Sequence, residues 1–164
     1  MVGMNRFLDR LDPDMCVVTA TSGGERAGCL VGFASQCSIR PTRFVVWLSK
    51  VNRTHEVAAA AEFLAVHLLT RDEHRLAALF GGETGHLADK FARAAWTSEY
   101  GGATVLRDAC AWFVGRIERR VDGGDHTGHV LAPVQSGAHG ATPHGTPLLR
   151  MADARTIDPG HPVD

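Results

Sequence analysis

The chain has 164 residues, a formal net charge of −1, 45% apolar residues and 21% charged residues. A chain of this length suits one globular domain, which buries roughly 70% of its unfolded surface and needs neither a metal nor a disulfide to fold. The near-neutral charge argues against a broad nucleic-acid-binding surface but leaves room for a local basic pocket.

The sequence carries no sign of a membrane segment or of secretion. No apolar run reaches the roughly 20 residues that a membrane helix requires. The opening stretch, MVGMNRFLDRLDPDM, has neither a long apolar core nor a small-residue cleavage site, so no signal peptide is expected. The cysteines form no CxxC pair, and the first three of them lie in predicted strands, where they suit small core positions: Cys16, Cys29, Cys37 and Cys110. These features predict a cytoplasmic protein with reduced thiols and no membrane or nucleic-acid partner.

The first part of the chain predicts strands joined by turns. Residues 3–11 favour a short amphipathic helix, and residues 15–21 favour a strand that ends in a hairpin-like turn. A second strand is expected over residues 27–39, which is long for a strand. Gly28 and Gly32 lie inside it, and glycine within a strand indicates a bulge or a place where something approaches the backbone closely.

The loop after a third predicted strand, residues 43–49, carries the most informative polar cluster. Within six residues, beside the start of a helix predicted over residues 54–62, stand Ser49, Lys50, Asn52, Arg53 and Thr54. Backbone N–H groups at a helix start and nearby cations suit a phosphate, with Arg as a bidentate donor and Lys as a point charge. The same residues also suit an ordinary capped helix, with Asn52 or Thr54 as the cap. The hypothesis is a phosphate-bearing ligand whose body lies along the preceding strands.

The second part of the chain predicts more strands around inserted helices. In order, we expect a strand at 63–69, a helix at 71–80, an irregular segment at 97–104, and strands at 109–121 and 126–134 that pair antiparallel. Residues 135–164 are expected as a loop and a tail, beyond a core at about 5–134 of a single domain over 1–164. Five or six strands with short turns favour a small β-barrel. A doubly wound parallel sheet fits worse, because the first three strands have no helix between them.

Three sets of residues, in this order, resemble the flavin reductase-like family of FMN-binding split barrels. They are Phe33, Ser35 and Ser38 before a proline turn, then Asn52-Arg53-Thr54, and then Gly124-Asp125-His126 after a long strand. The resemblance spans about residues 5–134. It implies a mainly β fold, a six-stranded antiparallel split β-barrel, in a homodimer with flavin at the subunit interface. It also implies hydride transfer from NADH or NADPH to FMN, with FAD possible, and a monooxygenase that receives the reduced flavin.

The resemblance assigns roles to further residues. It places His126 near the flavin and the nicotinamide, with Asp125 setting its tautomer. Because hydride transfer needs no proton donor at the moment of transfer, the expected role of His126 is orientation and charge. Lys90 and Phe91 are also placed near the flavin, although their own pattern favours a helix end with Phe91 in the core.

The flavin ring is expected beside Val31, Gly32, Phe33 and Ser35, with the protein supplying position and electrostatics. Family members usually carry hydroxyl residues where Val31 and Gly32 stand, and commonly Asn where His67 stands. Ring contacts would therefore fall to backbone N–H groups, and we expect weaker flavin binding or altered redox behaviour.

Two alternatives stay open. One is an FMN-binding split barrel that carries electrons or stores flavin with little NAD(P)H turnover, which the missing hydroxyls favour somewhat. The other is an oxidoreductase that uses another flavin, such as a deazaflavin. No metal is expected despite nine histidines, because no compact ligand pattern appears among His126, His129, His139 and His144. A GxSxG elbow is missing, so a serine hydrolase has no support.

Overall fold

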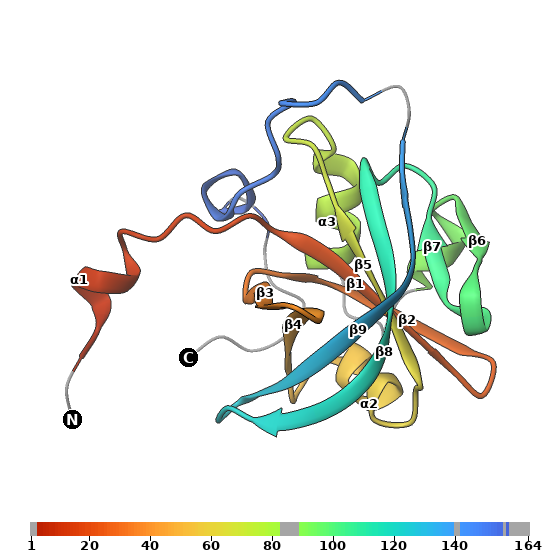
Figure 1. Ribbon diagram of the computed structural model, residues 1–164. Helices are drawn as coiled ribbons and strands as arrows, with labels where there is room; N and C mark the ends of the chain where they lie inside the picture. Colours follow the sequence, from red (N-terminus) through yellow and green to blue (C-terminus); the bar gives the residue numbers. More distant parts are fainter. Residues whose placement is uncertain (1–2, 83–88, 140–141, 156, 158–164) are drawn as a thin grey trace.

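One antiparallel sheet of seven strands forms the body of the molecule in the computed structural model (Figure 1). The structure describes residues 3–82, 89–139, 142–155 and 157. In sheet order the strands are β2 (Glu25–Val31), β1 (Cys16–Ser22), β5 (Phe63–Leu68), β8 (Ala111–Asp122), β9 (His126–Ala138), β4 (Thr42–Ser49) and β3 (Ala34–Ile39). Within this described part of the chain, no ladder joins the edge strands β2 and β3. The mainly β, antiparallel split-barrel prediction is therefore confirmed.

The predicted strand over 27–39 is wrong as one element, which raises the strand number from six to seven. β2 ends at Val31 and β3 begins at Ala34, so Gly32 and Phe33 carry the chain from one edge of the sheet to the other. The Phe33 carbonyl accepts a hydrogen bond from the backbone N–H of Trp47 on β4, at 2.9 Å. The glycine at position 32 thus lies at the break between the two edge strands, where the barrel is open.

Strand β1 is buried on both faces, which explains its unbroken apolar run. Cys16 and Val18 face a core inside the barrel, whereas Val17 faces a second core outside the sheet. Successive strand side chains point to opposite faces, so one strand serves both cores. Cys29 joins the inner core as predicted, but the core prediction is wrong for Cys37, which lies exposed on β3. All four cysteines are free thiols.

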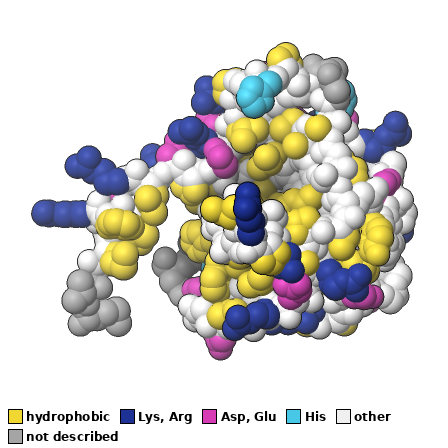
Figure 2. All heavy atoms as spheres, in the orientation of Figure 1, with side chains coloured by type: hydrophobic (Ala, Val, Ile, Leu, Met, Phe, Trp, Pro, Cys, Tyr) yellow, Lys and Arg dark blue, Asp and Glu magenta, His cyan; other side chains and the backbone are white. Residues whose placement is uncertain are grey.

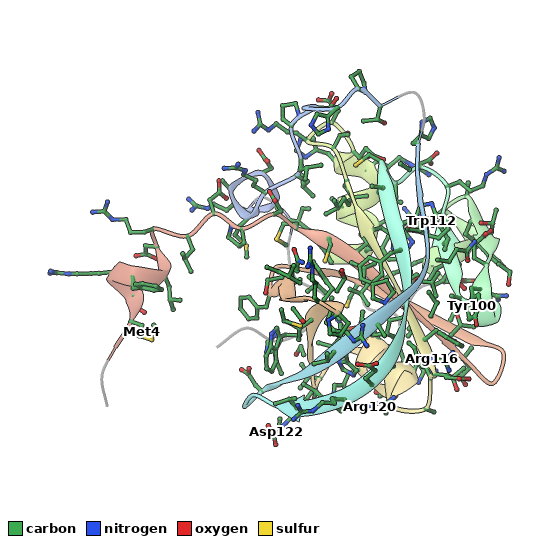
Figure 3. All side chains as sticks on the ribbon, in the orientation of Figure 1. Met4, Tyr100, Trp112, Arg116, Arg120 and Asp122 are labelled. Carbon is green, nitrogen blue, oxygen red and sulfur yellow. The ribbon has the colours of Figure 1, made fainter. Side chains whose placement is uncertain are left out.

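Helix α2 (Arg53–Ala59) begins at the polar loop and packs on β1 and β2. The Asn52 side chain accepts a hydrogen bond from the Thr54 backbone N–H at 2.9 Å, so Asn52 is the N-cap. At the other end, the Arg120 guanidinium of β8 donates to the Ala58 carbonyl at 2.9 Å (Figure 3). Both ends of this short helix are thereby fixed by side chains.

The second core lies under helix α3 (His74–Gly82) and the short helix η1 (Lys90–Ala92). The Phe80 ring of α3 sits against Gly28, where an added Cβ would come within 2.7 Å of a ring carbon. The close approach predicted at Gly28 is therefore made by the chain itself. No helix in the described ranges is long and apolar enough to cross a membrane.

The segment predicted as irregular over 97–104 instead forms a small second sheet. Its strands are β6 (Trp96–Ser98) and β7 (Thr104–Leu106), joined by the short helix η2 (Tyr100–Gly102). The Thr19 hydroxyl of β1 donates to the Thr104 carbonyl at 2.5 Å, which ties this sheet to the barrel. Three-residue strands stabilised by such long-range contacts leave little periodicity in the sequence.

His67 lies fully buried where β1, β5 and β7 meet. Its Nδ1–H donates to the Val17 carbonyl at 2.8 Å, and its Nε2 accepts from the Leu106 backbone N–H at 3.0 Å. Burial lowers the pKa of His67 to about 4, against a smaller opposing effect of the Val17 carbonyl. His67 is thus a neutral structural bridge away from the strand break.

The tail returns to the barrel after a longer last strand than predicted. The loop prediction is wrong for residues 135–138, which belong to β9. Further on, the Leu149 backbone pairs with Leu69 and with Met15, and the short helix η3 (Met151–Ala154) follows. The C-terminal residues 158–164 lie outside the described residues.

The N-terminal helix α1 (Asn5–Leu8) stands away from the body and is shorter than the predicted 3–11 (Figure 1). Hydrophobic side chains gather on this arm in the space-filling view (Figure 2). Phe7 is 61% exposed and Leu8 is 51% exposed. Their amphipathic pattern therefore finds no core within the described part of the same chain.

Candidate functional site

A cavity of about 120 Å³ lies at the break between β2 and β3. It is lined by residues from five places in the chain: Cys29, Leu30, Val31, Gly32, Phe33, Trp47, Ser49, Asn52, His126 and Met151. The sheet register explains part of this set, because Ser49 at the end of β4 pairs with His126 at the start of β9. The structure therefore brings together six of the predicted site residues: Val31, Gly32, Phe33, Ser49, Asn52 and His126.

His126 is held at the cavity by a carboxylate and an aromatic ring. Its Nδ1 lies 2.7 Å from Oδ1 of Asp125, and because a carboxylate accepts, the proton of the neutral ring sits on Nδ1. This hydrogen bond lowers the pKa of the Asp125 carboxyl. The His126 and Phe33 ring centroids are 5.0 Å apart at a tilt of 50°. The His126 ring is thus oriented by Nδ1, and Nε2 takes no part in the hydrogen bond to Asp125.

The two predicted phosphate-binding cations do not line the cavity and are engaged with carboxylates. Lys50 donates to Asp122 at 2.8 Å, at the tip of β8 (Figure 3). Arg53 donates to Glu56 at 2.8 Å and also forms an ion pair with Glu25. These pairs are partly or largely exposed, so each contributes little to stability. If a phosphate bound at this loop, Lys50 and Arg53 would give up weak ion pairs with carboxylates and form ion pairs with the phosphate instead.

Thr54, which is not part of the cavity lining, carries a buried polar atom that the described residues leave unsatisfied. Its side chain is fully buried, and Oγ1 has no hydrogen bond of ordinary geometry to any described residue. The hydroxyl lies close enough to the Cys29 thiol to lower the Cys29 pKa, but burial has the larger effect and raises it. An orphaned buried hydroxyl is uncommon in folded proteins and is expected at sites that receive a ligand or water.

Lys90 and Phe91, on η1, are not part of the cavity lining. The Lys90 ammonium is buried and donates to the Gly28 carbonyl at 3.0 Å and to the Phe80 carbonyl at 3.1 Å. Phe91 packs against Phe80, with ring centroids 5.5 Å apart. The structure thus gives these two residues packing contacts and does not bring them to the other predicted site residues. Exposed Ser35 on β3 also stays outside the lining.

Four residues of the lining escaped prediction: Cys29, Leu30, Trp47 and Met151. The glycine at position 128, inside a predicted strand, could have indicated that a large side chain packs there. In the structure an added Cβ at Gly128 would come within 2.8 Å of the Trp47 ring. Met151 had no such indication, since it reaches the cavity from a segment distant in the sequence.

Two larger cavities, of about 380 and 330 Å³, share His139 at the opposite end of β9. The first is lined by residues that include Glu73 and Asp108, and neither contains a predicted site residue. Among the residues that the structure describes, no group of three or more His, Cys, Asp or Glu side chains is placed to hold a metal.

The fold and this cavity define a class of small antiparallel split-barrel domains with a partly polar site at the strand break. The chain belongs to the flavin reductase family, because the family model described as "Flavin reductase like domain" matches residues 9–155. It is similar to FMN reductase (NADH) RutF of Agrobacterium fabrum, with 31% identity over 71% of this chain and 67% of that protein. It is also similar to NADH-dependent FMN reductase AsuE2 of Streptomyces nodosus subsp. asukaensis, with 30% identity over 92% of this chain and 81% of that protein.

The solved structures support the same fold. The flavin reductase domain protein from Arthrobacter sp. FB24 matches with a TM-score of 0.77 at 18% identity, over 98% of this chain and 96% of that one. The chain spans only 59% and 41% of the length of two other curated relatives. The activities of these relatives bear on this chain only as a proposal.

Proposed function

We propose that the protein is an FMN-binding NAD(P)H:flavin oxidoreductase. The observation that carries this proposal is the cavity at the strand break, where Gly32, Phe33, Ser49, Asn52 and His126 converge in a chain of the flavin reductase family. A bound flavin would supply the hydride-accepting chemistry, and the protein would supply position and electrostatics.

Two groups of residues fit the two ends of a flavin, the phosphate and the ring system. Within the described residues, Thr54 offers an unsatisfied hydroxyl at the helix start, and Arg53 and Lys50 offer cations whose ion pairs are partly or largely exposed. These groups suit the phosphate end, together with Ser49 and Asn52. The end near Gly32 is apolar and narrow, since 120 Å³ is well below the roughly 300–1,000 Å³ of ordinary ligand sites. The ring would therefore lie in a groove rather than in the enclosed volume.

His126 would act by orientation and charge. Asp125 fixes its proton on Nδ1, so a neutral His126 presents Nε2 as an acceptor beside Phe33. FAD remains a possible substrate in place of FMN, and Ser35, Lys90 and Phe91 remain part of the proposed site only through the family resemblance. Lys90 would support β2 through its hydrogen bond to the Gly28 carbonyl.

We also propose a homodimer, a cytoplasmic location, and a monooxygenase as recipient of the reduced flavin. The proposed dimer is supported by exposed apolar side chains on the arm, at the cavity, in the loop after β4 and at the end of β3, namely Phe7, Leu8, Phe33, Val51 and Ile39. Contiguous exposed apolar surface commonly marks a protein–protein interface. Four free cysteines suit a reducing compartment.

The test of the activity is oxidation of NADH or NADPH by the purified chain with added FMN. We expect FMN-dependent loss of the nicotinamide absorbance, with FAD and riboflavin compared in parallel. Binding of FMN without any consumption of NADH or NADPH would contradict the reductase proposal. It would favour the alternative of an electron carrier or flavin store, which the apolar surroundings of Gly32 support.

The phosphate assignment has its own test in Arg53→Ala. Hydrogen bonds to a charged group contribute about 1.5–3 kcal/mol, and the Glu25 and Glu56 pairs offset part of this, so we expect about tenfold weaker binding of FMN. Binding of riboflavin, which lacks the phosphate, should change less than twofold. Arg116→Ala is the matched control, because it removes an Arg–Glu62 pair of 2.7 Å at another place on the surface. Equal losses for FMN and riboflavin would remove the assignment.

A further inference from the structure

Gly32 leaves a space that another part of the chain fills. A Cβ built on Gly32 would lie 2.5 Å from Cε of Met151 and 3.1 Å from Sδ of Met15. Met151 also lines the cavity, whereas Met15 is 6% exposed and belongs to the outer core. The methyl end of Met151 therefore occupies the position where a side chain at residue 32 would stand.

The segment that carries Met151 is anchored on both sides of that residue. The Met151 backbone N–H donates to the Pro13 carbonyl at 2.9 Å, and the Ala152 N–H donates to Oδ1 of Asp12 at 2.8 Å. Asp153 accepts from the Arg150 backbone N–H at 2.9 Å. With its backbone held in this way, η3 positions the Met151 side chain against Gly32 as part of the cavity wall.

We infer that Met151 is a binding residue of the flavin site, where it forms the apolar wall that contacts the ring system. This inference rests on the proposed function and deepens it. A thioether donates no hydrogen bond, but it packs well against aromatic rings and adapts to irregular gaps. The C-terminal segment thereby provides an apolar contact where a hydroxyl at residue 32 would have provided a polar one.

The decisive variant is Met151→Ala, titrated with FMN and with riboflavin by flavin fluorescence. Loss of a sulfur–aromatic contact predicts binding weaker by about two- to tenfold. Because the contact is with the ring, the factor should be the same for both ligands, unlike that of Arg53→Ala. Met15→Ala is the matched control, since it removes the other methionine side chain beside Gly32, which belongs to the outer core. It should lower the melting temperature and change the dissociation constants less than twofold.

A second pair of variants tests the exchange between the two positions. Gly32→Ser should displace the Met151 methyl group and weaken flavin binding, whereas the double variant with Met151→Ala should regain binding close to that of the unmodified chain. Such non-additivity is expected for residues that are in contact or share a cavity, and not for distant, independent sites.

Unchanged or tighter flavin binding by Met151→Ala, or strictly additive effects in the double variant, would overturn this inference alone. Failure of the unmodified chain to bind any flavin would overturn the proposed function and this inference with it. The readouts are binding and thermal stability, so they do not depend on turnover.

Discussion

His67 and Thr54 are both sealed from solvent, yet only one of them is satisfied by the chain. Both ring nitrogens of His67 have backbone partners on neighbouring strands, whereas the hydroxyl of Thr54 has none among the described residues. Buried polar groups normally find partners, and an unsatisfied one costs about 1–3 kcal/mol. Where β1, β5 and β7 meet, the buried polar side chain is fully hydrogen-bonded by the chain. At the start of α2, the buried hydroxyl needs a further hydrogen-bonding partner.

The largest expected effect comes from breaking the satisfied side of this comparison with His67→Leu. The Val17 carbonyl and the Leu106 N–H would lose their buried partner, so we expect a loss of about 3–5 kcal/mol in the free energy of unfolding. Urea denaturation measures it. His74→Leu at the exposed start of α3 is the control and should change stability by less than about 0.5 kcal/mol. A loss of the same small size for both variants would show that His67 is no bridge.

The next effect is a dependence of stability on pH. The pKa of His67 is about 4 in the folded chain and about 6.5 when unfolded, so the unfolded state binds more protons between these values. Stability from this group is complete above pH 6.5 and falls as the pH drops towards 4, by up to about 3 kcal/mol.

His129 acts in the same direction, because burial also lowers its pKa to about 4. Urea midpoints measured from about pH 7 to about pH 4.5 should therefore fall, and fall less in His67→Leu. An identical acid sensitivity in the variant would contradict the assignment.

The smallest effect on stability belongs to the unsatisfied side, tested by Thr54→Val. Since Oγ1 has no hydrogen bond of ordinary geometry to the described residues and only the Cys29 thiol is known to lie close to it, the free energy of unfolding should stay within about 1 kcal/mol, while binding of FMN weakens about threefold or more. Thr19→Val is the matched control, because the Thr19 hydroxyl is already bonded to the Thr104 carbonyl. It should lose stability and keep its affinity for FMN. Unchanged affinity in Thr54→Val would mean that the hydroxyl serves no ligand.

Local sequence patterns predicted the barrel, and together with the family resemblance they predicted six of the ten residues that line the cavity. Strands β4, β5, β8 and β9 are apolar or alternating, and the cap at Asn52 follows from its residue type and position. His126 was found through its Gly-Asp-His setting, and the register of β4 and β9 brings it to Ser49.

The errors arose where distant contacts override local preference. The sequence around Gly32 reads as a continuous strand, because the crossing from one sheet edge to the other depends on partners elsewhere. For Lys90, which the family resemblance places near the flavin, no local pattern indicates that its buried ammonium donates to two backbone carbonyls. Met151 could not have been found, since its contact with Gly32 joins segments far apart in the sequence.

The two-residue link at Gly32 and Phe33 has a consequence for how the barrel opens. Both free edges of the sheet start from this link, so a molecule seated against it touches the place where β2 and β3 would separate. Local unfolding of either edge strand would then require the bound ligand to dissociate first. The melting temperature should accordingly rise with ligand concentration, and amide protons of both edge strands should exchange more slowly together.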